Sequence, residues 1–243
     1  DLLWQLFDLT AEVQLRLLVL DTLGVVATGD AKTLARMNAF LDAQNAILKT
    51  GKVPDARLVN AAVDALGSLG DASSFPILFS AMTGGYSAEV TARARDALYR
   101  IKGDLKDNLL NIMRTRPLAD KRAALSLALE SSTLVDASKA TIAEYGLDVG
   151  LHAPARDAME KQIAREMRYA AAKVLSEKGW SSASALALEH FDLVQSEYER
   201  GLATKKQLTD AMDFLGNMRS DEAASRLTLY LVLVNSATEQ GKG

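Results

Sequence analysis

The stretch that decides the fold is residues 58–71, which read LVNAAVDALGSLGD. Its apolar residues recur at intervals of four, three, one and three positions, at Leu58, Ala62, Ala65, Leu66 and Leu69. This spacing places all of them on one stripe of an α-helix, whereas a strand would scatter them over both faces. The stretch therefore predicts an amphipathic helix that ends at Gly70.

The same signature recurs along the chain as Asp, then Leu two positions later, then an aliphatic residue three positions after that. Four copies are clear, at 21–26, 64–69, 96–101 and 213–218, and two weaker copies of the apolar stripe lie at 125–129 and 167–175. Self-similarity at a period of a few tens of residues is typical of helical-repeat proteins. We therefore expect six related units.

Each clear stripe is followed by a glycine or polar break and then by a second apolar segment. The second segments are 31–49, 75–82, 105–113 and 222–238. Glycine can end the first helix in a left-handed conformation, and Asp or Ser can cap the amides that begin the second. The segment 227–234 is rich in β-branched residues, but we assign it to a helix because it occupies the second-helix position. The unit is thus helix, tight turn, helix.

Proline and glycine mark the boundaries between these helices. Pro54, Pro76, Pro117 and Pro154 each stand at the head of a helical stripe, where the missing amide costs nothing. Residues 145–154 form the loosest stretch, and a long helix is expected from about 154 to 178. We expect one domain over residues 1–243, with a bend or sub-division near 146–153, because stacked repeats share a core.

The pattern Leu-x-x-x-Ala-x-x-Ala-Leu-x-x-Leu-Gly-Asp at 58–71 resembles a HEAT repeat of the HEAT/armadillo class of α-solenoids, and the clearest match covers residues 55–104. Lys121 and Ser132 replace apolar positions, and Ile77 stands where such repeats often carry a charge. The resemblance implies an all-α fold, a right-handed α–α superhelix of about six helix pairs. It also implies a concave surface of second helices that binds a protein or peptide.

Composition excludes several classes of function. The 243 residues include no cysteine, which removes disulfides, thiolate metal sites and cysteine nucleophiles. The formal net charge of −3 does not favour nucleic acid as a partner. No apolar run approaches the ~18 residues of a membrane span. Because the chain starts at Asp1 without a signal pattern, we expect a processed chain or a piece of a larger chain or assembly, either cytoplasmic or exported after removal of a signal.

No residue cluster predicts catalysis, a metal site or a cofactor. His190 lies in Glu-His-Phe-Asp at 189–192, but adjacent helical residues point about 100° apart and cannot converge on one ligand. We expect a solvated or core-edge histidine. Gly84-Gly85 is read as a turn, and the serine pairs at 131–132 and 181–182 as helix caps. The sequence therefore predicts a protein that is not an enzyme.

Residues 93–122 hold nine basic and four acidic side chains inside an otherwise acidic chain. One reading is a set of solvated, ion-paired helix faces. The other is a surface for an anionic partner, with Arg95, Tyr99 and Lys102 on one face and Lys106 and Arg114 on the next helix.

The leading hypothesis is a non-enzymatic scaffold that binds a protein or peptide through exposed polar residues of the second helices. The alternative is a HEAT-like nucleic-acid-binding or DNA-base-processing protein that uses the basic region 93–122. A purely structural module of a larger assembly is a third possibility. The candidate partner-binding residues are Asn38, Asn45, Arg95, Tyr99, Lys102, Lys106, Asn108, Asn111, Arg114, Trp180 and His190. Trp180 and Trp4 are interpreted either as side chains that bind a partner or as side chains that fill the core.

Overall fold

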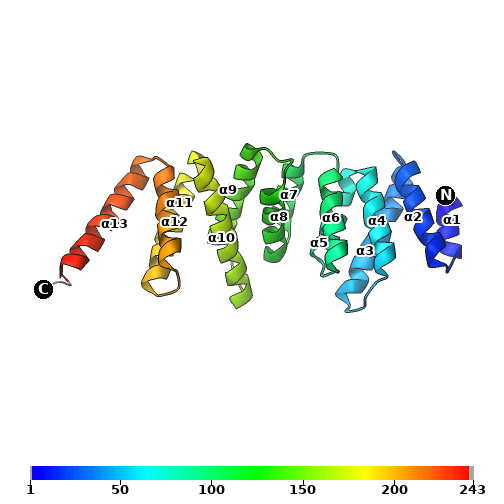
Figure 1. Cartoon of the computed structure of the whole chain (residues 1–243), viewed down its shortest axis with the longest axis horizontal. Coiled ribbons are helices and arrows are strands. Elements are labelled where there is room, and N and C mark those ends of the chain that lie inside the picture. Colours follow the sequence, from blue (N-terminus) through cyan, green and yellow to red (C-terminus); the bar gives the residue numbers. More distant parts are fainter. Residues whose placement is uncertain (1, 241–243) are drawn as a thin grey trace. The chain divides into compact units, whose positions relative to one another are not determined.

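A computed structural model describes residues 2–240, with the side chains of 235 and 237–240 excepted. The described residues form thirteen α-helices, two short 3₁₀ helices and no β-strand, which confirms the all-α prediction. The elements are α1 (Leu2–Leu9), α2 (Val13–Val26), α3 (Ala31–Lys49), α4 (Ala56–Leu69), η1 (Ala72–Ser74), α5 (Phe75–Thr83), α6 (Ala88–Arg100), α7 (Leu105–Thr115), α8 (Leu118–Glu130), α9 (Asp136–His152), α10 (Ala158–Lys178), η2 (Ser181–Ala183), α11 (Ser184–Glu199), α12 (Lys205–Asn217) and α13 (Asp221–Gln240) (Figure 1).

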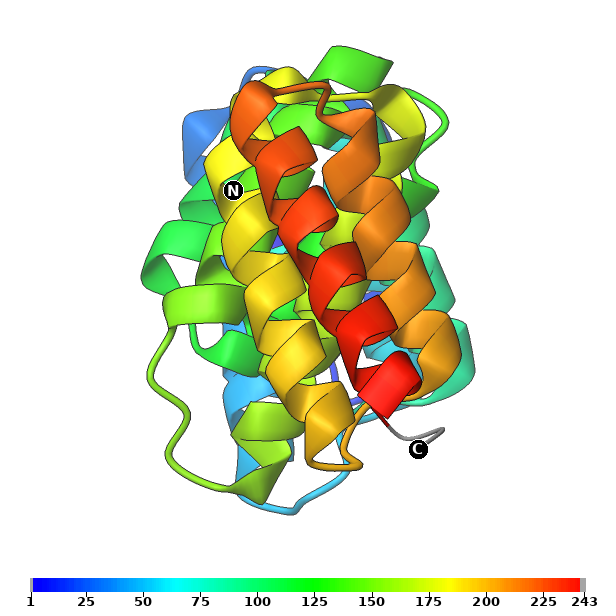
Figure 2. The same ribbon diagram turned by 90° about the vertical axis from the view of Figure 1, so that its left-hand side faces the viewer.

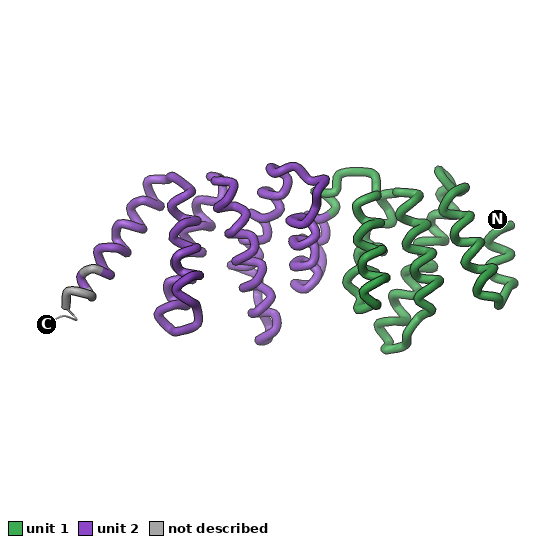
Figure 3. Tube along the Cα trace, in the orientation of Figure 1, with its two compact units in different colours: residues 1–108 green, residues 109–243 purple. Residues whose placement is uncertain are grey.

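The chain divides into two compact units, residues 1–108 and 109–243 (Figure 3). In the first unit, α2, α4 and α6 pack side by side in one row, and α3 and α5 pack together in a second row. In the second unit, α8, α10 and α12 form the first row, and α9, α11 and α13 form the second. Figure 2 shows α13 lying against both α11 and α12.

Small residues of the repeated motif bring the first-row helices of unit 1 into close contact. A Cβ added at Gly24 would lie 2.8 Å from the Cα of Ala65, and one added at Gly67 would lie 2.7 Å from the Cβ of Ala97. Both glycines stand three positions after the motif Asp, and both alanines stand one position after the next motif Asp. The motif therefore encodes the contact between neighbouring repeats as well as the helix itself.

The predicted helix boundaries hold at most of the turns. Gly70 ends α4 in the left-handed conformation, with φ of 66°. Asp30 accepts hydrogen bonds from the backbone N–H groups of Lys32 and Thr33 and caps α3, which spans the predicted 31–49. The segment 227–234 is helical, as predicted from its position in the second-helix slot.

Two boundary predictions are wrong. Residues 145–152 are not loose but belong to α9, because glycine there serves close packing: a Cβ at Gly150 would lie 2.8 Å from the carbonyl oxygen of Ala164 on α10. The long helix α10 begins at Ala158 and not near Pro154, because Asp157 caps it by accepting from the N–H of Glu160. The prediction of a single domain over 1–243 stays a prediction.

None of the helices described between residues 2 and 240 combines the length and apolar character needed to cross a bilayer.

Candidate functional site

A groove of about 820 Å³ lies between α10 and α12 in the second unit. We call it the α10–α12 groove. Its walls come from nine residues of α10, four of α12, Leu202 of the intervening loop and His190 of α11. Most of the lining residues are exposed or half-buried, whereas Ala172 and His190 are buried and form its floor.

His190 is the most unusual residue of this groove. Its side chain is 1% exposed and lies edge-on to two rings, with centroids 5.5 Å from Tyr169 and 6.0 Å from Phe214. Burial, and secondarily the charge of Arg168, lowers the pKa of His190 to about 3, so the imidazole is neutral at pH 7. Its Nδ1 atom is buried without a hydrogen-bond partner among the described residues. The solvated reading of His190 is therefore wrong, and the ring belongs to the core beneath the groove.

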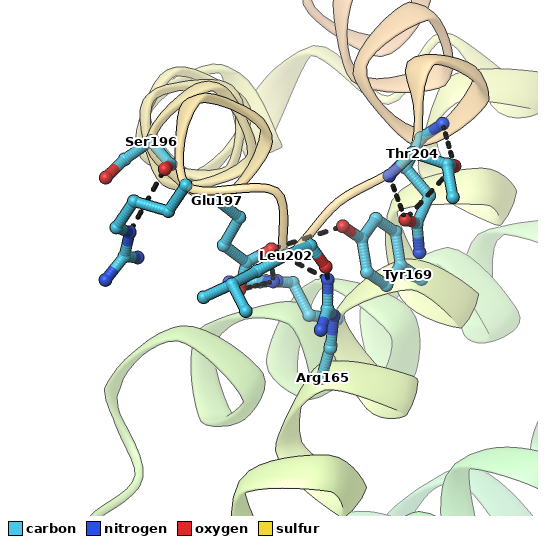
Figure 4. Close-up of polar contacts among 9 residues, drawn as sticks. Arg165, Tyr169, Ser196, Glu197, Leu202 and Thr204 are labelled. Atoms are coloured by element: carbon cyan, nitrogen blue, oxygen red, sulfur yellow. Dashed lines mark hydrogen bonds and ion pairs between the residues drawn. The ribbon is translucent and has the colours of Figure 1, made fainter.

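A buried ion-pair cluster lies beside this histidine. Arg168 is 3% exposed and its Nη2 donates to both carboxylate oxygens of Glu197, each at 2.8 Å. The Tyr169 hydroxyl donates to the same carboxylate at 3.3 Å, and Arg165 Nη2 lies 3.5 Å from it (Figure 4). Two guanidinium groups therefore share one carboxylate, and this cluster carries a formal surplus of one positive charge. The Nε of Arg168 is also buried without a partner among the described residues.

The loop between α11 and α12 is held against α10 by the same residues. Arg165 donates to the carbonyl oxygen of Leu202, and the Leu202 N–H donates to the backbone oxygen of Glu197 at 2.7 Å (Figure 4). Thr204 then begins α12 with a capping box, in which its hydroxyl accepts from the Gln207 N–H and the Gln207 side chain accepts from the Thr204 N–H. Hydrogen bonds within the chain thus hold this rim of the groove in place.

The exposed rim of the groove carries charges of both signs that pair with one another. Lys206 lies 2.7 Å from Asp210, and Glu166 accepts from Arg122 at 2.6 Å. Lys173 and Glu177 are 4.0 Å apart. Over the whole lining, four acidic side chains stand against three basic ones, namely Glu166, Glu177, Asp210 and Asp213 against Arg165, Lys173 and Lys206.

Among the described residues, no three or more His, Asp or Glu side chains lie close enough together to bind a metal ion.

A second, smaller cavity of about 340 Å³ lies on the other row of unit 2, lined by α7, α9 and α11. Arg114 lines it together with Tyr145 and Asp148. Trp180 donates its indole N–H to the Glu144 carboxylate in the same lining at 2.7 Å, so it is a half-buried structural contact. His152 bridges Asp148 and Glu189, at 2.9 and 2.7 Å.

The prediction that polar residues of the second helices are exposed is wrong at two positions in unit 1. Asn38 and Asn45 are 8% and 3% exposed. Their amide groups donate to the Ser73 hydroxyl at 3.4 Å and to the Ile77 carbonyl at 3.2 Å. The amide nitrogens of both asparagines are thus turned toward neighbouring helices, where they find acceptors, while both Oδ1 atoms are buried without a partner among the described residues.

The remaining candidates are distributed without forming one site. Arg95, Lys102, Asn111 and Arg114 are exposed, and Tyr99, Lys106 and Asn108 are half-buried. Within the basic region, Arg93 contacts Asp64 at 2.5 Å and Glu89 at 3.2 Å. These pairs support the reading of region 93–122 as ion-paired helix faces.

Four residues of the buried cluster, namely Arg165, Arg168, Tyr169 and Glu197, were not predicted. One signal was present in the sequence. Arg168 stands on the apolar stripe of α10, four residues after Ala164 and seven before Leu175, where a charged residue is out of place. An arginine in such a position must be paired inside the fold.

Comparison of the chain with protein-family models, with curated proteins and with solved structures finds no match. The site must therefore be interpreted from its own geometry and chemistry.

Proposed function

We propose that this protein is a non-enzymatic helical-repeat scaffold that binds a segment of another protein in the α10–α12 groove. The observation that carries the proposal is the groove itself, about 820 Å³, with a rim held by hydrogen bonds and at its floor the buried His190, whose Nδ1 has no hydrogen-bond partner among the described residues. A few fixed polar groups in a concave surface are typical of binding sites. The groove runs from Gln162 to Glu177 along α10, about 22 Å of helix at 1.5 Å per residue, which suits an extended segment.

We further propose that the helices form six consecutive pairs, from α2–α3 to α12–α13, in a right-handed superhelix of the HEAT/armadillo kind. This is supported by the alternation of consecutive helices between two rows within each unit. It is also supported by the motif-encoded Gly24–Ala65 and Gly67–Ala97 contacts. Repeats that cannot bury their apolar faces alone are stabilised by such neighbours.

The proposed docking surface differs from the second-helix surface that the HEAT resemblance implies. The groove lies on the row of first helices, while Asn38 and Asn45 of the second helices are buried in contacts within unit 1. Arg114 and the smaller cavity on the second row remain available for the same partner or another one.

The test is selection of a displayed random-peptide library on the full chain, followed by binding of the enriched peptides to two variants. Ala170→Trp introduces a large side chain into the groove from an exposed lining position, and we expect it to abolish binding. Ala92→Trp, at an exposed alanine of α6 in unit 1, is the matched control and should bind like the wild type. Failure to enrich any peptide, or equal binding by both variants, would contradict the proposal.

Nucleic-acid binding through region 93–122 is the competing function. The ion pairs of Arg93, and that of Arg122 with Glu166, leave less free positive charge than the sequence count indicates. We expect no salt-dependent retention on heparin or on a short duplex at two salt concentrations, whereas a protein that neutralises several phosphates loses affinity steeply with salt.

A further inference from the structure

The smaller cavity of unit 2, about 340 Å³ and lined by α7, α9 and α11, combines an apolar surface with two carboxylates. Leu110 of α7 is 6% exposed, and Leu186 of α11 and Tyr145 of α9 are half-buried. Glu144 and Asp148 stand four residues apart on α9, so their side chains lie on the same face of this helix. A cavity with an apolar part and a charged part suits a side chain that has both parts.

One oxygen of each carboxylate is held by the chain and the other is free. Trp180 and Ser182 both donate to Glu144 Oε2, at 2.7 and 2.8 Å, and His152 Nδ1 lies 2.9 Å from Asp148 Oδ1. No described residue donates a hydrogen bond to Glu144 Oε1 or Asp148 Oδ2. Solvent reaches both carboxylates, because Glu144 Oε1 is not among the buried atoms without a partner and the Asp148 side chain is 52% exposed. Two positioned acceptors are therefore open to a ligand.

Charge at this cavity favours a cationic occupant. The lining carries two acidic side chains and one basic one, Arg114, which is exposed and forms no ion pair among the described residues. The same sign extends over the second row, where α9, α11 and α13 carry nine acidic and two basic side chains up to Val234. The first-row helices α8, α10 and α12 carry seven acidic and nine basic ones. A basic partner is thus attracted to the row that holds the cavity.

We infer that this cavity binds an arginine or lysine side chain of a partner protein, whose cationic head is received by the free oxygens of Glu144 and Asp148. The aliphatic stem of that side chain lies along Leu110 and Leu186, since arginine and lysine join an apolar stem to a charged head. An acidic side chain would meet two like charges, and an aliphatic one would leave both carboxylates without a cation. The inference goes beyond the proposed function, because it assigns a second site on the other row of unit 2.

The test selects a displayed random-peptide library on full-chain Ala170→Trp protein, which carries a large side chain in the α10–α12 groove, so that enriched peptides bind elsewhere. We expect these peptides to share an arginine or lysine whose replacement by glutamine weakens binding about tenfold. Glu144→Gln should weaken binding by a similar factor, and Asp148→Asn about two- to fivefold, because the Asp148 carboxylate is half exposed. Both substitutions keep an oxygen that can accept from the chain's own donors, so the fold is retained.

Glu199→Gln is the matched control, because it removes the same charge from an exposed position of the same row, about 20 Å along α11 from Leu186. It should bind the enriched peptides like its Ala170→Trp parent. Equal weakening by Glu144→Gln and Glu199→Gln would show attraction by net charge alone and overturn the inference. No enrichment, peptides without dependence on a basic residue, or binding unchanged by both cavity variants would overturn it as well. Each of these results leaves the proposed function standing, since selection on the wild-type chain tests the α10–α12 groove separately.

Discussion

Replacing Gly67 by alanine tests whether the repeated motif encodes the packing between repeats. The new Cβ would lie 2.7 Å from the Cβ and 3.0 Å from the Cα of Ala97, so α4 and α6 must separate locally. Overpacking of this kind costs about 1–3 kcal/mol. Alanine is also a better helix former than glycine by about 1 kcal/mol. We expect a net loss of up to about 2 kcal/mol in the free energy of unfolding of unit 1.

Gly216 supplies a control at the same motif position, three residues after Asp213. The nearest atom to a Cβ added there is Leu227 Cδ1 at 3.8 Å, an ordinary van der Waals contact. Gly216→Ala should therefore gain at most about 1 kcal/mol from helix propensity alone. The two substitutions are chemically identical, so their difference of about 1–3 kcal/mol isolates the contact with the neighbouring repeat.

Urea denaturation followed by tryptophan fluorescence measures the two units separately. Trp4 is buried in unit 1 and Trp180 lies in unit 2, and the chain has no other tryptophan. Trp180→Phe is the background for Gly67→Ala, and Trp4→Phe is the background for Gly216→Ala. Equal stabilisation by both alanines would refute the assignment of the motif glycine to close packing.

The histidines and the buried ion pair give three further predictions. The pKa of His190 is lowered to about 3, so the contribution of the neutral ring to the stability of unit 2 is lost as pH falls below the unfolded pKa near 6.5. The free energy of unfolding of unit 2 should fall by about 2 kcal/mol by pH 5, and His190→Phe should remove this pH dependence in denaturation measured at several pH values. Hydrogen bonds that the His152 ring donates to Asp148, and secondarily to Glu189, raise the pKa of His152. The contribution of His152 to the stability of unit 2 is therefore full below pH 6.5 and lost as pH rises through the folded pKa. Because the ring is half exposed, His152→Gln should lose no more than about 1 kcal/mol at pH 6 and show little effect at pH 9. Glu197→Ala leaves Arg168 buried without a counter-charge and should cost about 3–5 kcal/mol, whereas Glu199→Ala, on the same helix, should be nearly neutral in the same urea titration.

The fold was predictable because the motif is local. The copy at 58–71 holds its apolar stripe, its ending glycine and its following cap within about fifteen residues, and Asp30 and Gly70 serve as the sequence indicates. Gly150 misled the prediction because the same residue type serves loops and close helix contacts, and only the position of Ala164 on another helix distinguishes the two. Asn38 and Asn45 misled it because a polar residue on a helix reveals its direction only when its partner, such as Ile77, is known.

The candidate site was less predictable because its members are distant in the sequence. Arg168 and Glu197 lie twenty-nine positions apart and on different helices. An apolar-stripe arginine indicates that some buried partner exists, but several acidic residues of α11 could have supplied it. The choice of Glu197 follows from the way α10 and α11 pack, which no short motif records.

The α10–α12 groove lies at one of the contacts where larger residues replace the small pair of the repeat. Aligned on the apolar stripe, Ser176 of α10 takes the position of Gly67, and Phe214 of α12 takes that of Ala97. In unit 1 the small pair lets neighbouring first-row helices touch, whereas the larger pair accompanies an open groove between α10 and α12, with Ser176 in its lining and Phe214 packed edge-on to His190. The small pair is also absent from the contact between α8 and α10, where Glu130 and Val174 take the same two positions. Its loss therefore accompanies the groove but does not by itself produce it, and the stack in unit 2 depends on larger side chains.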